Sequence, residues 1–109
     1  MEYKIDISSL AQSEADKAFL FMLKVSSPEN ARYWYEGLLK AIFSLSTMPK
    51  RCVLARENDY FSQEIRQLIY GKGKNCYRIL FTILEDDKSP TVRILHIRHV
   101  SQITLGEIN

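Results

Sequence analysis

Two arginines and two histidines carry the most distinctive chemistry in this sequence. Arg66 and Arg78 each stand among apolar neighbours, and a guanidinium can hold a phosphate or a carboxylate through two parallel hydrogen bonds. An arginine stem can equally cover apolar surface while its charge stays in water. His96 and His99 could transfer a proton near neutral pH or be ordinary structural residues. The four side chains therefore indicate either phosphate chemistry or a structural role, and both alternatives stay open.

No metal or cofactor site is expected. Cys52 and Cys76 are far apart and in no spacing typical of zinc ligands, so we expect two reduced thiols. His96 and His99 are three residues apart on an expected strand, which sends their side chains to opposite faces. A zinc ion needs about four ligands, and these residues do not supply them.

The glycine-rich segment Gly71–Lys74 is interpreted as a hairpin turn. It lacks the spacing before Gly-Lys and the following Ser or Thr that define a phosphate-binding loop, and no helix follows it. Its lysines, Lys72 and Lys74, are therefore expected to be turn residues that can contact a partner.

Hydrophobic periodicity predicts one strand followed by two helices in the first half of the chain. Residues 3–7 alternate apolar and polar, as in a strand, and Ser8-Ser9 then offers an N-cap for a helix that starts near residue 10. A second helix follows Ser27-Pro28, with Gly37 at a close helix–helix approach. Because the linker is short, the two helices must run antiparallel. The apolar stripe of the second helix comprises Ala31, Trp34, Tyr35, Leu38, Ile42 and Leu45.

The residue pattern in the second half of the chain is typical of β-strands. Strands are expected at residues 64–70, 76–84 and 91–100, with the last one central because it is apolar on both faces. Residues 51–55 are expected to be a short extended stretch and 57–59 a loop. Adjacent strands would bring Arg66 and Arg78 onto one face of the sheet. The predicted fold is α+β, in the order βααβββ, with a helical hairpin packed on a small, mostly antiparallel sheet.

Length, composition and charge narrow the possible functions. The 109 residues, 46% of them hydrophobic and 26% charged, describe a single globular domain over residues 1–109. No apolar run approaches the roughly 18 residues of a membrane span, and the N-terminus lacks a signal-peptide pattern, so a cytoplasmic protein is expected. Residues 49–84 carry seven Lys or Arg against three Asp or Glu, whereas residues 1–48 carry five against six. A basic sheet half suits a polyanion or an acidic protein partner.

The element order and three of the strands resemble the RelE/ParE toxin superfamily, also called plasmid stabilisation proteins. The resemblance covers nearly the whole chain, and its most specific parts are Tyr77-Arg78-Ile79-Leu80-Phe81 and Ile94-Leu95-His96-Ile97-Arg98-His99. It implies the toxin half of a type II toxin–antitoxin pair, neutralised by a cognate antitoxin that wraps an extended, partly helical segment around it. Some members are ribosome-dependent endoribonucleases that cut mRNA, and others inhibit DNA gyrase without cutting RNA.

Carried over residue by residue, the resemblance gives a partial nuclease site. It implies that Arg78 would contact the scissile phosphate, with Arg66 on the preceding strand and His99 near the end of the last strand. Ser101 stands where nucleases and many gyrase inhibitors carry arginine, and Gln67 with Leu68 replaces a lysine pair. The departures favour gyrase inhibition; an mRNA endonuclease and a non-toxic antitoxin-binding relic remain the alternatives, as does a homodimer. The residues expected to bind a partner are Lys72, Lys74, Tyr77, Arg93 and Arg98.

Overall fold

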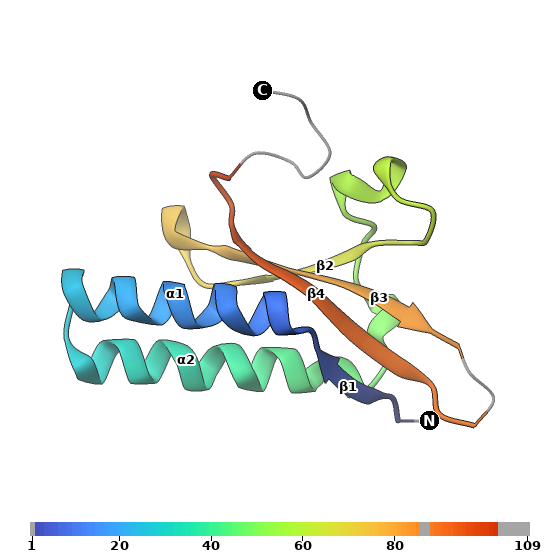
Figure 1. Cartoon of the computed structure of the whole chain (residues 1–109), viewed down its shortest axis with the longest axis horizontal. Coiled ribbons are helices and arrows are strands. Elements are labelled where there is room, and N and C mark those ends of the chain that lie inside the picture. Colours follow the sequence, from blue (N-terminus) through green and yellow to red (C-terminus); the bar gives the residue numbers. More distant parts are fainter. Residues whose placement is uncertain (1, 86–87, 103–109) are drawn as a thin grey trace.

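The computed structural model describes residues 2–85 and 88–102. Within them, one strand precedes two helices and three strands follow, which confirms the predicted βααβββ order and α+β class (Figure 1). The elements are β1 (Lys4–Ile7), α1 (Ser9–Val25), α2 (Pro28–Phe43), β2 (Arg66–Tyr70), β3 (Tyr77–Leu84) and β4 (Thr91–His99).

The four strands form one sheet in the order β1-β4-β3-β2. β1 pairs with β4 in parallel, while β4–β3 and β3–β2 are antiparallel. The sheet is therefore mostly antiparallel, and the last strand is central, as its apolar residues on both faces predict. β1 and β2 are the two edge strands.

Side-chain caps set the start of both helices. Ser8 Oγ accepts a hydrogen bond from Ala11 N at 3.1 Å, and Ser27 Oγ accepts one from Asn30 N at 3.1 Å. Pro28 occupies the first turn of α2, where its missing N–H costs nothing. The cap of α1 is thus Ser8 and not Ser9. Only Ser26 and Ser27 join the helices, which form the predicted antiparallel hairpin.

The main core lies between the helical hairpin and one face of the sheet, called here the helix face. Leu38, Ile42 and Leu45 are 0–1% exposed and share a cluster with buried residues of β3 and β4. The apolar stripe of α2 therefore packs where the sequence predicts. The strand residues of this cluster are Ile79, Phe81, Val92, Ile94 and Ile97.

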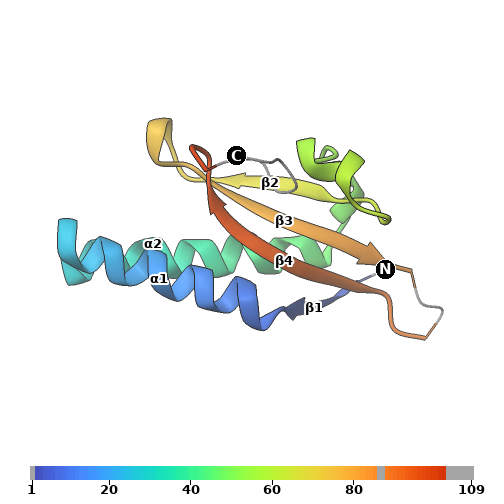
Figure 2. The same ribbon diagram turned by 45° about the horizontal axis from the view of Figure 1, so that its top comes forward.

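The opposite face of the sheet, the outer face, is covered by the end of the segment between α2 and β2, from Ala55 to Ile65. Figure 2 shows the helical hairpin on one side of the sheet and the coiled turns that precede β2, in yellow-green, on the other. The expected extended stretch at residues 51–55 is present in part: Arg51 ends a 3₁₀ turn, Pro49–Arg51, whereas Cys52 and Ala55 have extended backbone. Leu54 makes a single antiparallel bridge to Arg66. Residues 57–59, expected as a loop, lie within a further 3₁₀ turn, η3 (Arg56–Tyr60). A small second core forms beneath it from Ala55, Ile65 and Leu80, with Leu95 against them.

Gly37 is required by a strand residue and not by the other helix. A Cβ at this position would lie 2.1 Å from the hydroxyl oxygen of Tyr70, which donates a hydrogen bond to Trp34 O at 2.8 Å. The expected helix–helix approach at Gly37 is therefore wrong. The glycine lets β2 dock closely on α2.

Candidate functional site

Arg78 is buried on the outer face in a network that its own chain completes. Both guanidinium Nη atoms donate to the carboxylate of Glu57 in η3, with Nη1 2.8 Å from Oε2. Nε and Nη2 also donate to Gln67 Oε1 at 3.1 and 2.9 Å. Arg78 is 3% exposed and Glu57 0%. The guanidinium thus holds η3 to the sheet, and its donors face protein acceptors.

Arg66 lies on the helix face, so the expectation that it shares a face with Arg78 is wrong. In the β2–β3 register Arg66 is opposite Phe81, whereas Arg78 is opposite Ile69, three positions further along β2. Opposite residues share a face and neighbours along a strand alternate, so the two arginines point to opposite sides. Arg66 Nη1 donates to Cys52 O at 2.6 Å. Its guanidinium thus binds the backbone at the end of the 3₁₀ turn Pro49–Arg51.

The two histidines also lie apart. His99 is opposite Tyr77 at one end of the helix face, where the two rings pack edge to face with centroids 5.2 Å apart. His99 Nδ1 lies 2.7 Å from Ser101 Oγ. His96 is opposite Leu80, and its Nδ1 lies 3.2 Å from Glu14 Oε1 of α1. The expectation of opposite faces is confirmed.

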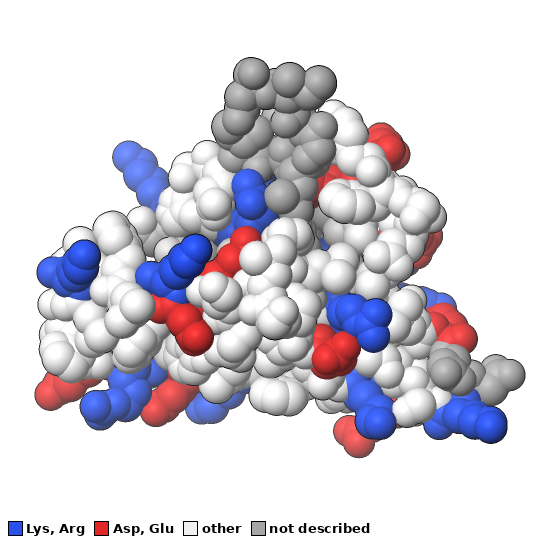
Figure 3. Space-filling view, viewed as in Figure 1, with Lys and Arg blue, Asp and Glu red and all other residues white. Residues whose placement is uncertain are grey.

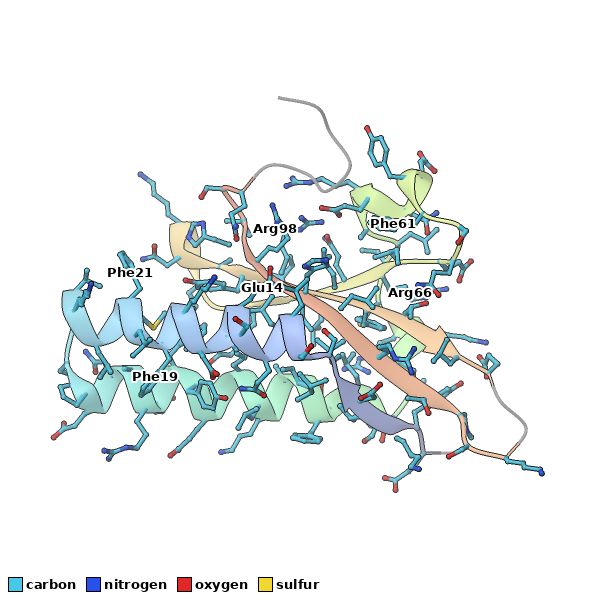
Figure 4. All side chains as sticks on the ribbon, in the orientation of Figure 1. Glu14, Phe19, Phe21, Phe61, Arg66 and Arg98 are labelled. Atoms are coloured by element: carbon cyan, nitrogen blue, oxygen red, sulfur yellow. The ribbon has the colours of Figure 1, made fainter. Side chains whose placement is uncertain are left out.

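The three candidate catalytic residues therefore do not meet. Arg78 is on the outer face, while Arg66 and His99 are on the helix face, on strands at different positions in the sheet. Figure 4 shows Arg66 well separated from Arg98, the residue that precedes His99 on β4. The geometry brings no phosphate-binding arginine beside a proton-transfer group among these three.

Lys72 lies at the rim of a groove between α2 and the end of β2. The groove has a volume of about 510 Å³. Tyr33 forms an 81% exposed wall. Lys74 follows in a short exposed 3₁₀ turn, Gly73–Asn75, and the segment joins β2 to β3, as its interpretation as a hairpin turn predicts. The groove is lined by Tyr33, Trp34, Glu36, Gly37, Lys40, Tyr70, Gly71 and Lys72.

The other candidate binding residues are spread over different environments. Tyr77 packs against the Trp34 ring with centroids 5.1 Å apart, and burial raises the pKa of its hydroxyl. Arg93 pairs with Asp6 of β1 at 2.8 Å. Arg98 is opposite Arg78 on the outer face. On the side of the molecule turned toward the viewer in Figure 3, basic and acidic side chains of the described residues are interleaved and form no continuous basic patch.

Two acidic residues that organise these surfaces were not among the sequence candidates. The sequence predicts a loop at Glu57, and nothing local marks this residue as the partner of an arginine 21 positions away. Glu14 of α1 accepts a hydrogen bond from Ile97 N at 2.9 Å, beyond the point where β1 stops covering β4. For Glu14, the one signal in the sequence is an acidic residue at a helix position that faces the free part of a strand.

Three further observations bear on the chemistry of the chain. Burial raises the pKa of the Cys52 thiol, which makes it a poor nucleophile. Within residues 2–85 and 88–102, no three His, Cys, Asp or Glu side chains lie close enough to hold a metal ion. No helix in those ranges is long and apolar enough to cross a membrane.

The fold class is α+β: two antiparallel helices cover one face of a four-stranded mixed sheet. Residues 5–104 match the family described as the ParE toxin of the type II toxin–antitoxin system parDE, and the chain belongs to that family. Among solved structures, it is similar to a chain of the chromosomal ParDE toxin–antitoxin system from P. aeruginosa, with a TM-score of 0.72 and 14% identity. The match covers 92% of this chain and 98% of that one. No curated protein matches.

Proposed function

We propose that this protein is a cytoplasmic toxin held inactive by a cognate antitoxin, and that it poisons its target by binding and not by cutting RNA. Family membership supports the toxin role and implies the antitoxin. A fold alone does not define an activity, so the mode of action is argued from the side chains.

The single observation that carries the proposal is the environment of Arg78. Cleavage of a phosphodiester needs preorganised donors aimed at the developing charge, together with a group that moves a proton. The Arg78 guanidinium already donates to Glu57 and Gln67 and is 3% exposed. A phosphate would have to displace a buried carboxylate from it. This favours inhibition through contact, in the manner of gyrase inhibitors, over mRNA cleavage.

The experiment is inducible expression alone and together with the protein of the adjacent gene. We expect growth arrest alone and rescue by co-expression. In vitro, the purified toxin should inhibit supercoiling by gyrase and leave ribosome-bound mRNA intact. Ribosome-dependent mRNA cleavage by the unmodified protein would overturn the proposed mode of action. Absence of growth arrest would favour the alternative of a non-toxic protein that only binds an antitoxin.

A double variant distinguishes a catalytic role of Arg78 from a structural one. Glu57→Leu combined with Arg78→Met removes both charges from the buried site while keeping its volume, so the fold should persist. If Arg78 only holds η3, the double variant keeps its toxicity. If Arg78 stabilises a transition state, the double variant should lose about two to three decades of activity.

A further inference from the structure

β2 is an edge strand whose free side is covered only in part by residues 2–85 and 88–102. Among the described residues, Gln67 N donates to Val53 O at 3.1 Å, and Leu54 bridges Arg66. Within the described part of the chain, the backbone contacts on this side of β2 end at Gln67. The strand continues for three more residues to Tyr70.

The uncovered part of β2 presents backbone groups at Ile69. Since Gln67 N points away from β3, and hydrogen-bonded pairs alternate along an antiparallel ladder, Ile69 N and O also point away from β3. The Ile69 side chain is 48% exposed. An unpaired N–H and C=O on an edge strand are a ready template for another extended chain.

The groove between α2 and β2 lies beside this open edge. Tyr70, on the helix face, and Lys72 bound it on the strand side, and Tyr33 and Lys40 bound it on the α2 side. Side chains of a strand alternate between faces, so a segment paired at Ile69 would direct every second side chain toward the aromatic groove wall. Two lysines at the rim against one acid, Glu36, favour acidic neighbours in that segment.

We propose that the open end of β2 and the adjoining groove bind an extended segment of the cognate antitoxin, which adds as a short strand at Ile69. The segment carries apolar or aromatic residues at alternate positions, which enter the groove, and acidic residues that meet Lys40 and Lys72. This inference rests on the proposed toxin–antitoxin pairing and adds where, and by which kind of contact, the partner binds.

The first test is hydrogen exchange on the complex with the protein of the adjacent gene, purified after co-expression. Amides of residues 68–72 should exchange more slowly in the complex than in the free toxin. Unchanged exchange over this segment in an intact complex would overturn the docking site and leave the toxin–antitoxin pairing standing. If no complex forms and growth is not rescued, the pairing fails and the docking site with it.

Two variant pairs add affinity measurements. Ile69→Pro removes the outward N–H at a position where an edge strand tolerates proline, whereas Ile69→Ala keeps it. The antitoxin should bind the proline variant about tenfold more weakly than the alanine variant. Lys40→Glu with Lys72→Glu should weaken binding by about tenfold and lower the association rate. Lys4→Glu, on β1 at the opposite edge of the sheet, is the control and should bind normally.

A second copy of this chain is the competing occupant of the open edge. Light scattering on the free toxin distinguishes it, since a dimer that the Ile69→Pro variant abolishes would assign the edge to self-association and overturn the proposal. A monomer with an intact antitoxin complex, weakened by the proline and glutamate variants and not by Lys4→Glu, would support it.

Discussion

The two faces of the sheet are stabilised in different ways. On the helix face, a large apolar cluster joins α1 and α2 to the central strands, with Phe81 and Ile42 almost fully buried. On the outer face, a small apolar cluster shares the cover with an ion pair between Arg78 and Glu57. The hydrophobic effect needs no alignment of partners, whereas a buried charge pair tolerates little change. Packing on the outer face thus depends more on the exact pairing of two side chains, whereas packing on the helix face buries more apolar surface.

The largest effect is expected from breaking the buried ion pair on one side only. Arg78→Met or Glu57→Leu alone should lower the free energy of unfolding by about 3–5 kcal/mol, because each removes one partner of a buried charge pair. The double variant should recover most of the loss. Denaturant unfolding of the four proteins checks this through a double-mutant cycle. Additive losses in the cycle would mean that the two residues act independently.

A matched pair of isoleucines compares the apolar clusters directly. Ile42 on the helix face and Ile65 on the outer face are 1% and 2% exposed. Ile42→Ala should cost the upper part of about 2–5 kcal/mol, because the large cluster around it cannot collapse into the cavity. Ile65→Ala should cost the lower part, since its cover is a turn that can shift. Equal losses in chemical denaturation would contradict the difference between the faces.

Short-range sequence patterns predict the helix that packs on the helix face, whereas strand register determines which side chains lie on the outer face. The stripe from Ala31 to Leu45 and the cap at Ser27 depend on residues within a few positions of one another, so sequence alone places α2 correctly. The faces of Arg66 and Arg78 depend on the register of β2 against β3, and a slip of one residue reverses every side chain. The residue types in the turn between β2 and β3 do not determine which residue of β2 lies opposite which residue of β3.

The same reasoning explains the other differences. Gly37 marks a close approach, but the sequence does not say that the approaching group is the hydroxyl of Tyr70, 33 positions later. Likewise, Glu57 is one acid in a basic stretch until the fold places it over Arg78. The chemistry of a side chain thus marks it as a candidate in the sequence, whereas its position in the structure depends on strand pairing and tertiary contacts.

Gly37 and Tyr70 test how tightly the edge of the helix face is packed. Gly37→Ala should destabilise the chain through its clash with the tyrosine hydroxyl, although alanine is the better helix former by about 1 kcal/mol. In a Tyr70→Ala background the same substitution should stabilise. The coupling energy between the sites is expected at about 1–3 kcal/mol. A thermal unfolding series of the four variants measures it, and an additive result would mean that the tyrosine moves aside freely.

The smallest effect is expected from an exposed ion pair, the counterpart of the buried one. Lys50 Nζ lies 2.6 Å from Glu85 Oε1 in solvent, and the hydrogen bond from Lys50 lowers the pKa of the Glu85 carboxyl. A carboxyl with a lowered folded-state pKa stabilises the fold above its ordinary pKa, and that contribution disappears as the pH falls through the lowered value. Glu85→Gln should therefore be slightly less stable than the parent at neutral pH and equal to it at the acid end. Because water and salt screen exposed pairs, added salt should shrink the neutral-pH difference, whereas the loss in the Glu57→Leu variant should persist in salt. A Glu85→Gln deficit that grows toward acid pH would contradict this assignment.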